Sequence, residues 1–359
     1  MKVLFVGPYP PPHGGVSVHV LGAHERMKRA GLQSSVLNVD PRAPASNAYV
    51  KISGAADLVC QLFRHVSDEW TLSVHTNGHN PKSWLIALMC GVAAQWGPPA
   101  SLTLHSGGVP VYLTAGSQWR RFIARLACLM YGQVVCVNGE IARAVSALGV
   151  PQSVLAITPA FLPFEKPGAG LPEDISRWIK THSPLLSTAM FFRPEYGFEL
   201  LLDAMKELRK VHPDAGCVVM GDGQHREKAV TQIESAGLRG AVLLTGDLDH
   251  EVCLVVMANS DVFVRPTFMD GDSISVREAA ALGVPVVASS VGTRPEGTVL
   301  FEVGNKVELV ERIEAVVGTD HPLPLGEGRV RVSGFGKTCD PHPRLARPLP
   351  EGEANSEHV

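Results

Sequence analysis

The chain has 359 residues, a length that suits two domains of about 100–200 residues each. Hydrophobic residues make up 45% of it and charged residues 19%, which is typical of a globular protein and excludes wholesale disorder, collagen and coiled-coil fibres. The net charge of −3 combines +6 over residues 1–150, −8 over residues 151–318 and −1 over residues 319–359. Either the two halves do different jobs, or the asymmetry is chance variation between two solvated surfaces.

The cysteine count and the apolar runs bear on the compartment. Seven cysteines without a Cys-x-x-Cys pair favour a reducing compartment over a disulfide framework or a Cys-based zinc site. The apolar run 3–6 is too short for a signal-peptide core, and the run 84–96 is shorter than the roughly 20 residues of a membrane span. We therefore expect a cytoplasmic protein, with peripheral contact at the inner face of the cell membrane as a further hypothesis.

Short aliphatic or β-branched runs alternate with longer amphipathic segments along the first half of the chain. The predicted strands are 2–6, 34–38, 72–75, 101–105 and 133–138. The predicted helices are 16–29, 55–66, 83–94, 119–131 and 139–148. A proline-punctuated segment, 158–171, then interrupts the pattern and is expected to join two domains.

The same alternation restarts in the second half of the chain. The predicted strands are 185–192, 216–221, 241–245, 262–266 and 285–289, and the predicted helices are 197–211, 224–236, 249–258, 275–282 and 307–317. Such alternation is typical of parallel sheets covered on both faces. We predict an α/β protein with two Rossmann-like domains, 1–165 and 166–318, and a ligand cleft between them at the carboxyl ends of the strands.

The last segment, 319–359, departs from this pattern. It is rich in Pro, Gly and Arg, shows no hydrophobic periodicity and carries few bulky apolar residues. Such a composition cannot bury enough surface to offset the entropy of ordering, so we expect a low-complexity, disordered tail.

Gly14 and Gly15 stand at the turn between the first predicted strand and the first helix. Adjacent glycines let backbone N–H groups approach an anion, and the amino end of the helix adds partial positive charge. The spacing is not Gly-x-Gly-x-x-Gly, so a dinucleotide site is not favoured. The alternative is a Gly-Pro turn without a ligand.

Two other strand ends carry residues that can face a ligand. His105 ends the predicted strand 101–105, and Gly221 and Gly223 follow the strand 216–221. Each signal is weak alone, because a single histidine is more often structural and a Gly-x-Gly turn is common.

The segment 262–289 is the most informative one. It reads as a strand, an acidic glycine-containing loop, a helix, a glycine stop and another strand. Asp270 in the loop and Glu278 in the helix have seven residues between them. The loop carboxylate can face the hydroxyls of a ligand, and Glu278, about one turn into the helix, can reach the same crevice.

In this order, these segments resemble the retaining glycosyltransferases of family four (glycosyl transferases group 1), which have the GT-B fold of two Rossmann-like domains with parallel sheets facing a central cleft. The resemblance extends over residues 1 to about 318. The segments that carry it are 11–16, 103–105, 135–138, 149–151, 157–161, 196–204, 221–223 and, above all, 270–289.

The resemblance implies a role for each matching residue. Glu278 would bond the ribose of a nucleoside diphosphate, in a nucleotide site that includes Gly221 and Gly223. The donor sugar and diphosphate would contact a larger set of residues: Asp270, Gly271, Asp272, Ser273, Ile274, Gly14 and Gly15. His105 and Asp270 would be catalytic, with His105 near the sugar and the leaving phosphate.

The implied activity is a hexosyl transfer, with retention, from a nucleoside-diphosphate sugar to a polysaccharide or lipid-linked glycan. Residues 1–165 would form the acceptor side, and residues 166–318 would bind the donor. Charge builds on the departing diphosphate, so electrostatic stabilisation would replace a nucleophile. We expect no cofactor, no metal ion and no nucleic-acid partner.

The sequence departs from the family pattern at three places. Asp270 stands where the family usually has Glu, and Phe191 and Tyr196 stand where the family has a phosphate-binding Arg and Lys. Arg193 is the nearby cation that could act on a phosphate by another route, so we count it among the catalytic candidates. The tail 319–359 replaces the usual terminal helix that crosses back to the first domain.

These departures keep other functions open. A catalytically impaired relative that binds a nucleotide or a partner protein is favoured by Phe191, Tyr196 and the altered C-terminus. A sugar-nucleotide 2-epimerase has the same fold, although the spacing from Asp270 to Glu278 favours the transferase. A nicotinamide dehydrogenase comes last.

A basic and aromatic segment, 119–125, suggests contact with an anionic membrane. It combines three arginines with Trp119, Phe122 and Ile123. Basic residues are attracted to anionic lipid, and aromatic side chains favour the interface. The alternative is an ordinary amphipathic helix packed on its sheet with solvated arginines.

Overall fold

The computed structural model describes residues 1–164, 167–223 and 225–318, and the predicted tail 319–359 lies outside this range. Contacts divide the described chain into two compact units. One unit holds Met1–Pro8 and His24–Pro159, and the other holds Tyr9–Ala23 and residues 160–318. Residues 9–23 therefore group with the second unit, and the domain bounds 1–165 and 166–318 stay a prediction.

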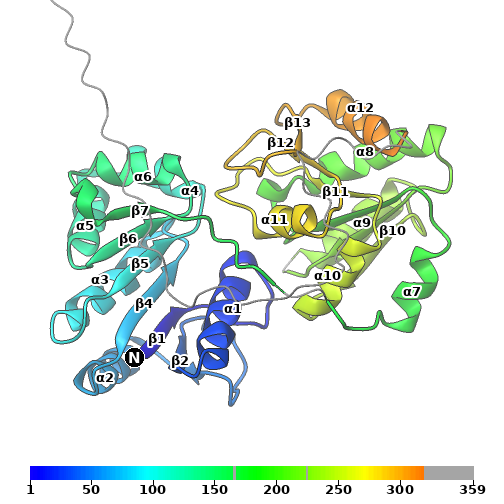
Figure 1. Ribbon diagram of the computed structural model, residues 1–359. Helices are drawn as coiled ribbons and strands as arrows, with labels where there is room; N and C mark the ends of the chain where they lie inside the picture. Colours follow the sequence, from blue (N-terminus) through cyan, green and yellow to red (C-terminus); the bar gives the residue numbers. More distant parts are fainter. Residues whose placement is uncertain (165–166, 224, 319–359) are drawn as a thin grey trace, which may run out of the picture. The chain divides into compact units, whose positions relative to one another are not determined.

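The first unit is built on a parallel sheet of seven strands in the order β3-β2-β1-β4-β5-β6-β7 (Figure 1). The strands are β1 (Lys2–Gly7), β2 (Gln33–Asn38), β3 (Val50–Lys51), β4 (Thr71–Thr76), β5 (Ser101–Leu104), β6 (Gln133–Cys136) and β7 (Leu155–Ile157). The helices are α1 (Gly15–Arg29), which begins among the residues of the second unit, α2 (Ala55–Ser67), α3 (Pro81–Ala94), α4 (Gly108–Thr114), α5 (Gln118–Leu129) and α6 (Gly139–Ser146).

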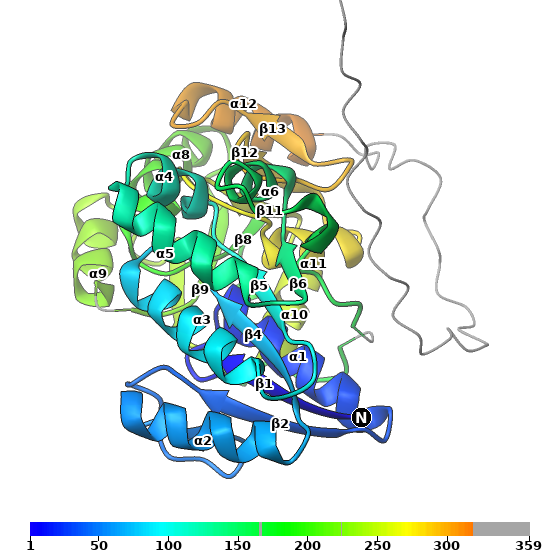
Figure 2. The same ribbon diagram turned by 90° about the vertical axis from the view of Figure 1, so that its left-hand side faces the viewer.

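Burial explains the apolar run within β1, an interior strand of this sheet. The four residues Val3, Leu4, Phe5 and Val6 of β1 are all buried, because helices cover both faces of a parallel sheet. α3 packs against both α2 and α5, and these three helices lie side by side in Figure 2.

The second unit contains a parallel sheet of six strands in the order β10-β9-β8-β11-β12-β13. The strands are β8 (Leu185–Ala189), β9 (Gly216–Met220), β10 (Val242–Gly246), β11 (Val262–Arg265), β12 (Val286–Ser289) and β13 (Val299–Phe301). The helices are α7 (Glu173–Ile179), α8 (Phe198–Val211), α9 (Arg226–Ser235), α10 (His250–Ala258), α11 (Ile274–Ala281) and α12 (Lys306–Val317).

Alternating side chains divide the core of this unit into two layers. Cys217 and Val219 of β9 pack in a cluster with α8, α9 and α12, whereas Val218 and Met220 pack in a second cluster with α7, α10 and α11. The period of two residues per strand accounts for this separation. The sheet is thus covered on both faces, as predicted.

No helix among the described residues is long and apolar enough to cross a membrane. The six cysteines in that part of the chain are all unpaired.

Candidate functional site

The predicted donor-site residues of the second unit gather at the carboxyl ends of its central strands. Gly221 and Gly223 follow β9, Asp270 follows β11, and Glu278 lies in α11, which leads from β11 to β12. Carboxyl ends of parallel strands meet at one edge of a sheet, where open α/β proteins bind their ligands.

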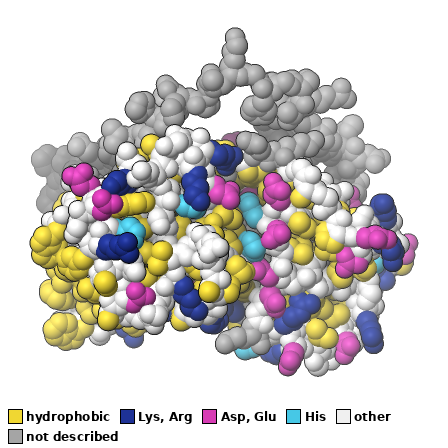
Figure 3. Space-filling model, turned by 90° about the horizontal axis from the view of Figure 1, so that it is seen from below, with side chains coloured by type: hydrophobic (Ala, Val, Ile, Leu, Met, Phe, Trp, Pro, Cys, Tyr) yellow, Lys and Arg dark blue, Asp and Glu magenta, His cyan; other side chains and the backbone are white. Residues whose placement is uncertain are grey.

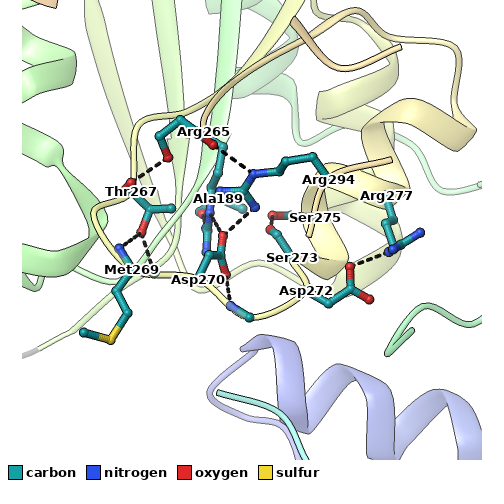
Figure 4. Close-up of polar contacts among 12 residues, drawn as sticks. Ala189, Arg265, Thr267, Met269, Asp270, Asp272, Ser273, Ser275, Arg277 and Arg294 are labelled. Carbon is teal, nitrogen blue, oxygen red and sulfur yellow. Dashed lines mark hydrogen bonds and ion pairs between the residues drawn. The ribbon is translucent and has the colours of Figure 1, made fainter. Parts of the chain in front are cut away.

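Asp270 is held between two arginines (Figure 4). Its Oδ2 accepts hydrogen bonds from Arg265 Nε at 3.0 Å and from Arg294 Nη1 at 2.9 Å, while Oδ1 accepts the Gly271 N–H at 3.2 Å. Burial acts to raise the pKa of Asp270, but Arg265 and Arg294 outweigh it and hold this pKa below its ordinary value. The Asp270 carboxylate is therefore an internal counter-ion.

The two arginines have further contacts of their own. Arg265 Nη1 donates to the Ala189 carbonyl at 2.7 Å, and the Arg265 guanidinium lies 5.0 Å from the centre of the Tyr196 ring. Arg294 Nε donates to the Ser289 carbonyl at 3.2 Å. Arg294 Nη2 is buried without a hydrogen-bond partner.

The loop between Asp270 and α11 contains a second hydrogen-bonded carboxylate, that of Asp272. Asp272 accepts hydrogen bonds from Arg277 Nε at 2.6 Å and from the Ala160 N–H at 3.0 Å. Burial raises the pKa of Asp272, against the opposing effect of Arg277. Ser273 precedes α11 without capping it, because its hydroxyl lies 3.2 Å from the Ser275 hydroxyl.

The glycine pair at the start of α1 approaches this loop closely. A Cβ atom on Gly14 would lie 2.9 Å from the Phe191 ring, and one on Gly15 would lie 3.8 Å from the Ile274 side chain. The preceding loop is fixed by His13, whose backbone N–H donates to Asp247 Oδ1 at 2.9 Å. The structure thus brings the predicted glycines beside the amino end of α11.

Glu278 is buried, with 5% of its surface exposed, and its Oε1 accepts a hydrogen bond from His250 Nε2 at 2.6 Å. His250 is the first residue of α10, and 25% of its side chain is exposed. The histidine fixes the orientation of the Glu278 carboxylate from a neighbouring helix.

Phe191 and Tyr196 stand where the family has cations, and an arginine guanidinium lies over each of these aromatic rings. Arg193 lies 5.7 Å from the centre of the Phe191 ring, and Arg265 occupies the corresponding place on Tyr196. Arg193 is 53% exposed and lies 3.9 Å from Glu195, too far for a tight ion pair.

The backbone conformation at Gly221 requires a glycine. Its φ is +134°, and a Cβ there would overlap the Met190 carbonyl oxygen. The glycine is required by the fold, whether or not a nucleotide lies against it.

His105 belongs to the first unit and directly follows β5. It is 8% exposed, and its Nε2 lies 3.1 Å from Nδ1 of His75. Its predicted place near the donor sugar stays a prediction.

Sequence reasoning missed three residues of this site: Arg265, Arg294 and His250. Arg265 did carry a signal, since a cation ends an otherwise apolar buried strand. Arg294 and His250 carried none, because their partners lie 24 and 28 residues away in the chain.

Comparison with known proteins gives a family match over part of the chain. Residues 178–317 match the family described as "Glycosyl transferases group 1". A 2-deoxystreptamine glucosyltransferase of Streptomyces kanamyceticus is 26% identical over 275 residues, which cover 71% of this chain and 69% of that protein. A phosphatidyl-myo-inositol mannosyltransferase of Propionibacterium freudenreichii is 30% identical over 170 residues, which cover 45% of this chain and only 42% of that protein.

Solved structures show the same fold. Anabaena Alr3699/HepE in complex with UDP has a TM-score of 0.67 at 17% identity, covering 89% of this chain and 90% of that one. Sucrose-phosphate synthase from Thermosynechococcus elongatus has a TM-score of 0.69 at 16% identity, with 89% and 90% covered.

The fold is therefore the α/β architecture of GT-B glycosyltransferases, with parallel sheets of seven and six strands. Residues 178–317 are similar to the glycosyl transferases group 1 family, whose model they match. The predicted fold class and the resemblance to this family are both confirmed.

Proposed function

We propose that the protein transfers a hexosyl group, with retention, from a nucleoside-diphosphate sugar to a polysaccharide or lipid-linked glycan. The observation that carries the proposal is the approach of Gly15 to Ile274, the first residue of α11, which is also the helix that carries Glu278. The UDP complex named among the similar structures and the relative named for phosphatidyl-myo-inositol support such a donor and a lipid-linked acceptor.

Each residue takes a role that its surroundings suit. Glu278 Oε1 is bound by His250, so we assign its second oxygen to a ribose hydroxyl. The backbone of residues 271–274 would face the donor sugar and diphosphate, and Gly14 and Gly15 would leave room for them. His105 would act near the sugar and the leaving phosphate.

Catalysis would rest on charge rather than on a covalent intermediate. Negative charge grows on the leaving diphosphate, and fixed cations and helix amino ends stabilise it best when they are already in place. Arg193, exposed beside Phe191, is one such cation. We propose that the reaction needs neither a metal ion nor another cofactor.

The proposal is tested by donor binding and turnover. Thermal unfolding with UDP, GDP and their sugars identifies the donor, and nucleotide release is then followed with and without lipid or glycan acceptor. Glu278→Gln should abolish donor stabilisation, while Glu311→Gln on the exposed face of α12 should not. Binding without turnover in any acceptor mixture would favour the catalytically impaired relative instead.

We further propose that the first unit docks on an anionic membrane. The sequence contains no Asp or Glu between Glu69 and Glu140, a segment that includes α3, α4 and α5. The cations of this segment are Lys82, Arg120, Arg121 and Arg125, all exposed. Exposed cations are attracted to anionic lipid at about 1 kcal/mol per basic residue near the surface.

Large apolar side chains accompany these charges. α5 buries the small residues Ala124, Ala127 and Cys128 and exposes Trp119 to 73% and Phe122 to 55%. The exposed apolar residues of α2 and α3 are Val59, Phe63, Leu85 and Val92, and exposed Trp96 follows α3. Hydrophobic side chains gather at the left-hand edge of Figure 3. Apolar and cationic groups on one face are typical of interfacial helices.

Co-sedimentation with vesicles tests this surface. The triple variant Arg120→Glu, Arg121→Glu and Arg125→Glu should lose binding to anionic vesicles at low salt. A control with equal charge change, Lys180→Glu, Lys228→Glu and Arg239→Glu in the second unit, should bind as the parent does. Equal binding of both variants, or dimerisation of the parent through this face without vesicle binding, would refute the membrane proposal.

A further inference from the structure

Arg294 has an unsatisfied hydrogen-bond donor. Its side chain is 5% exposed, and its Nη2 has no partner, although Nε and Nη1 are both bonded. A buried guanidinium nitrogen without an acceptor is costly, so such a group points to a ligand that completes it.

The cluster around Arg294 also carries surplus positive charge. Arg265 and Arg294 share the single carboxylate of Asp270, and both donate to the same oxygen, Oδ2. Asp272 also attracts Arg294 electrostatically, but the Asp272 carboxylate is already paired with Arg277. Arg265, Arg294 and Asp270 are each about nine-tenths buried, so water neutralises little of this surplus.

The amino end of α11 lies beside this charge. Ser273, the residue before the helix, is buried with 5% of its surface exposed, and its side chain does not cap the helix. The first N–H groups of a helix have no acceptor within it. Thr293, which precedes Arg294, donates its N–H to the Gly271 carbonyl at 2.8 Å and forms a β-bridge with Asp272. This pairing places Arg294 at the entrance to α11 (Figure 4).

A guanidinium nitrogen without a partner and an uncapped helix end both suit a phosphate. The planar fork of arginine matches phosphate oxygens, and helix amino ends favour anions. We propose that Arg294 binds the diphosphate of the donor and that Asp270 is a positioning residue that holds Arg294 and Arg265 ready for it. This inference rests on the proposed function.

The assignment changes the role expected for Asp270. Its Oδ2 is used by two arginines and its Oδ1 by the Gly271 N–H, and only 11% of its side chain is exposed. Asp270 therefore supports the diphosphate through Arg294 instead of holding the donor sugar. With Arg294 in this role, the site has a positive charge for the diphosphate even though Phe191 and Tyr196 stand at the family's cation positions.

Inorganic pyrophosphate, titrated into the full chain by calorimetry, tests Arg294 without a nucleotide. Arg294→Met should weaken pyrophosphate binding at least tenfold, and Arg312→Met, an ion-paired arginine of α12, should leave it unchanged. Equal affinity in Arg294→Met and the parent overturns the proposal. If Arg294→Met does not fold, Arg294→Lys, which lacks the fork, should bind pyrophosphate at least threefold more weakly, and parent-like affinity overturns it.

Asp270→Asn separates positioning from sugar binding. Because Asp270 acts through Arg294, the variant should weaken the nucleoside diphosphate and its sugar conjugate by the same factor. A selective loss of the sugar conjugate overturns the positioning role. If pyrophosphate binds through Arg294 but UDP, GDP and their sugars do not bind the parent, the proposed function fails and the anion site stands.

Discussion

Replacing His250 with alanine tests the account of Glu278. The change removes the 2.6 Å hydrogen bond to a carboxylate that is 5% exposed. Hydrogen bonds to charged groups contribute about 1.5–3 kcal/mol, and the partial exposure of His250 favours the lower end of that range. We therefore expect His250→Ala to lower the free energy of unfolding by roughly 1.5 kcal/mol.

The same variant should weaken binding of the ribose hydroxyls. If Glu278 binds a ribose hydroxyl, the parent prefers the ribonucleoside diphosphate to its 2′-deoxy and 3′-deoxy analogues. Loss of the His250 contact should reduce that preference about tenfold. Calorimetric titration of all three ligands measures it, with His212→Ala at the end of α8 as a control.

An unchanged preference in His250→Ala would refute the reasoning, because Glu278 would then either need no support or not contact the ribose. Glu278→Gln separates these cases. It should lose the preference if the carboxylate contacts the ribose and keep it if the carboxylate does not.

Four other results are expected. Gly221→Ala should cost at least about 2 kcal/mol of unfolding free energy by urea titration, because strained φ and overlap combine, whereas Gly237→Ala, with φ of +71° and open space, should cost less. Asp270 has a lowered pKa, so its stabilising effect is complete above the unfolded pKa of about 3.9 and is lost as pH falls through the folded value. The stability difference between the parent and Asp270→Asn should therefore be constant from about pH 7 to 5 and shrink below about pH 4; a constant difference down to about pH 2.5 would contradict the ion-pair account. Arg193→Ala should weaken a nucleoside diphosphate far more than the nucleoside, and equal losses would indicate a structural role. Nucleotide release should persist in excess EDTA, and its loss there would refute metal-free transfer.

The elements that the sequence predicted well are those with a clear period. The expected helix 197–211 and strand 216–221 correspond to α8 and β9 within a residue or two, because their apolar positions repeat as a helix or an all-buried strand requires. α4 (Gly108–Thr114) was missed, since seven residues with a proline give no recognisable period. β13 was missed because it is a three-residue edge strand.

The candidate site was predictable only in part, because some of its interacting residues lie far apart in the sequence. Gly14, Asp270 and Glu278 could be proposed because each stands in a local pattern of strand, turn and helix. The arginines that use the Asp270 carboxylate could not, because a side-chain pair across 24 residues depends on how two loops meet. Local patterns therefore suggested candidate residues, while the contacts among their charged groups required the structure.

The most direct test of the central claim is to follow the reaction by proton NMR with α-linked UDP- and GDP-sugars and a lipid or glycan acceptor. The account predicts consumption of one donor and an α-linked product, with no turnover in Glu278→Gln. A β-linked product would contradict retention, and turnover by Glu278→Gln at the parental rate would contradict the assigned donor site.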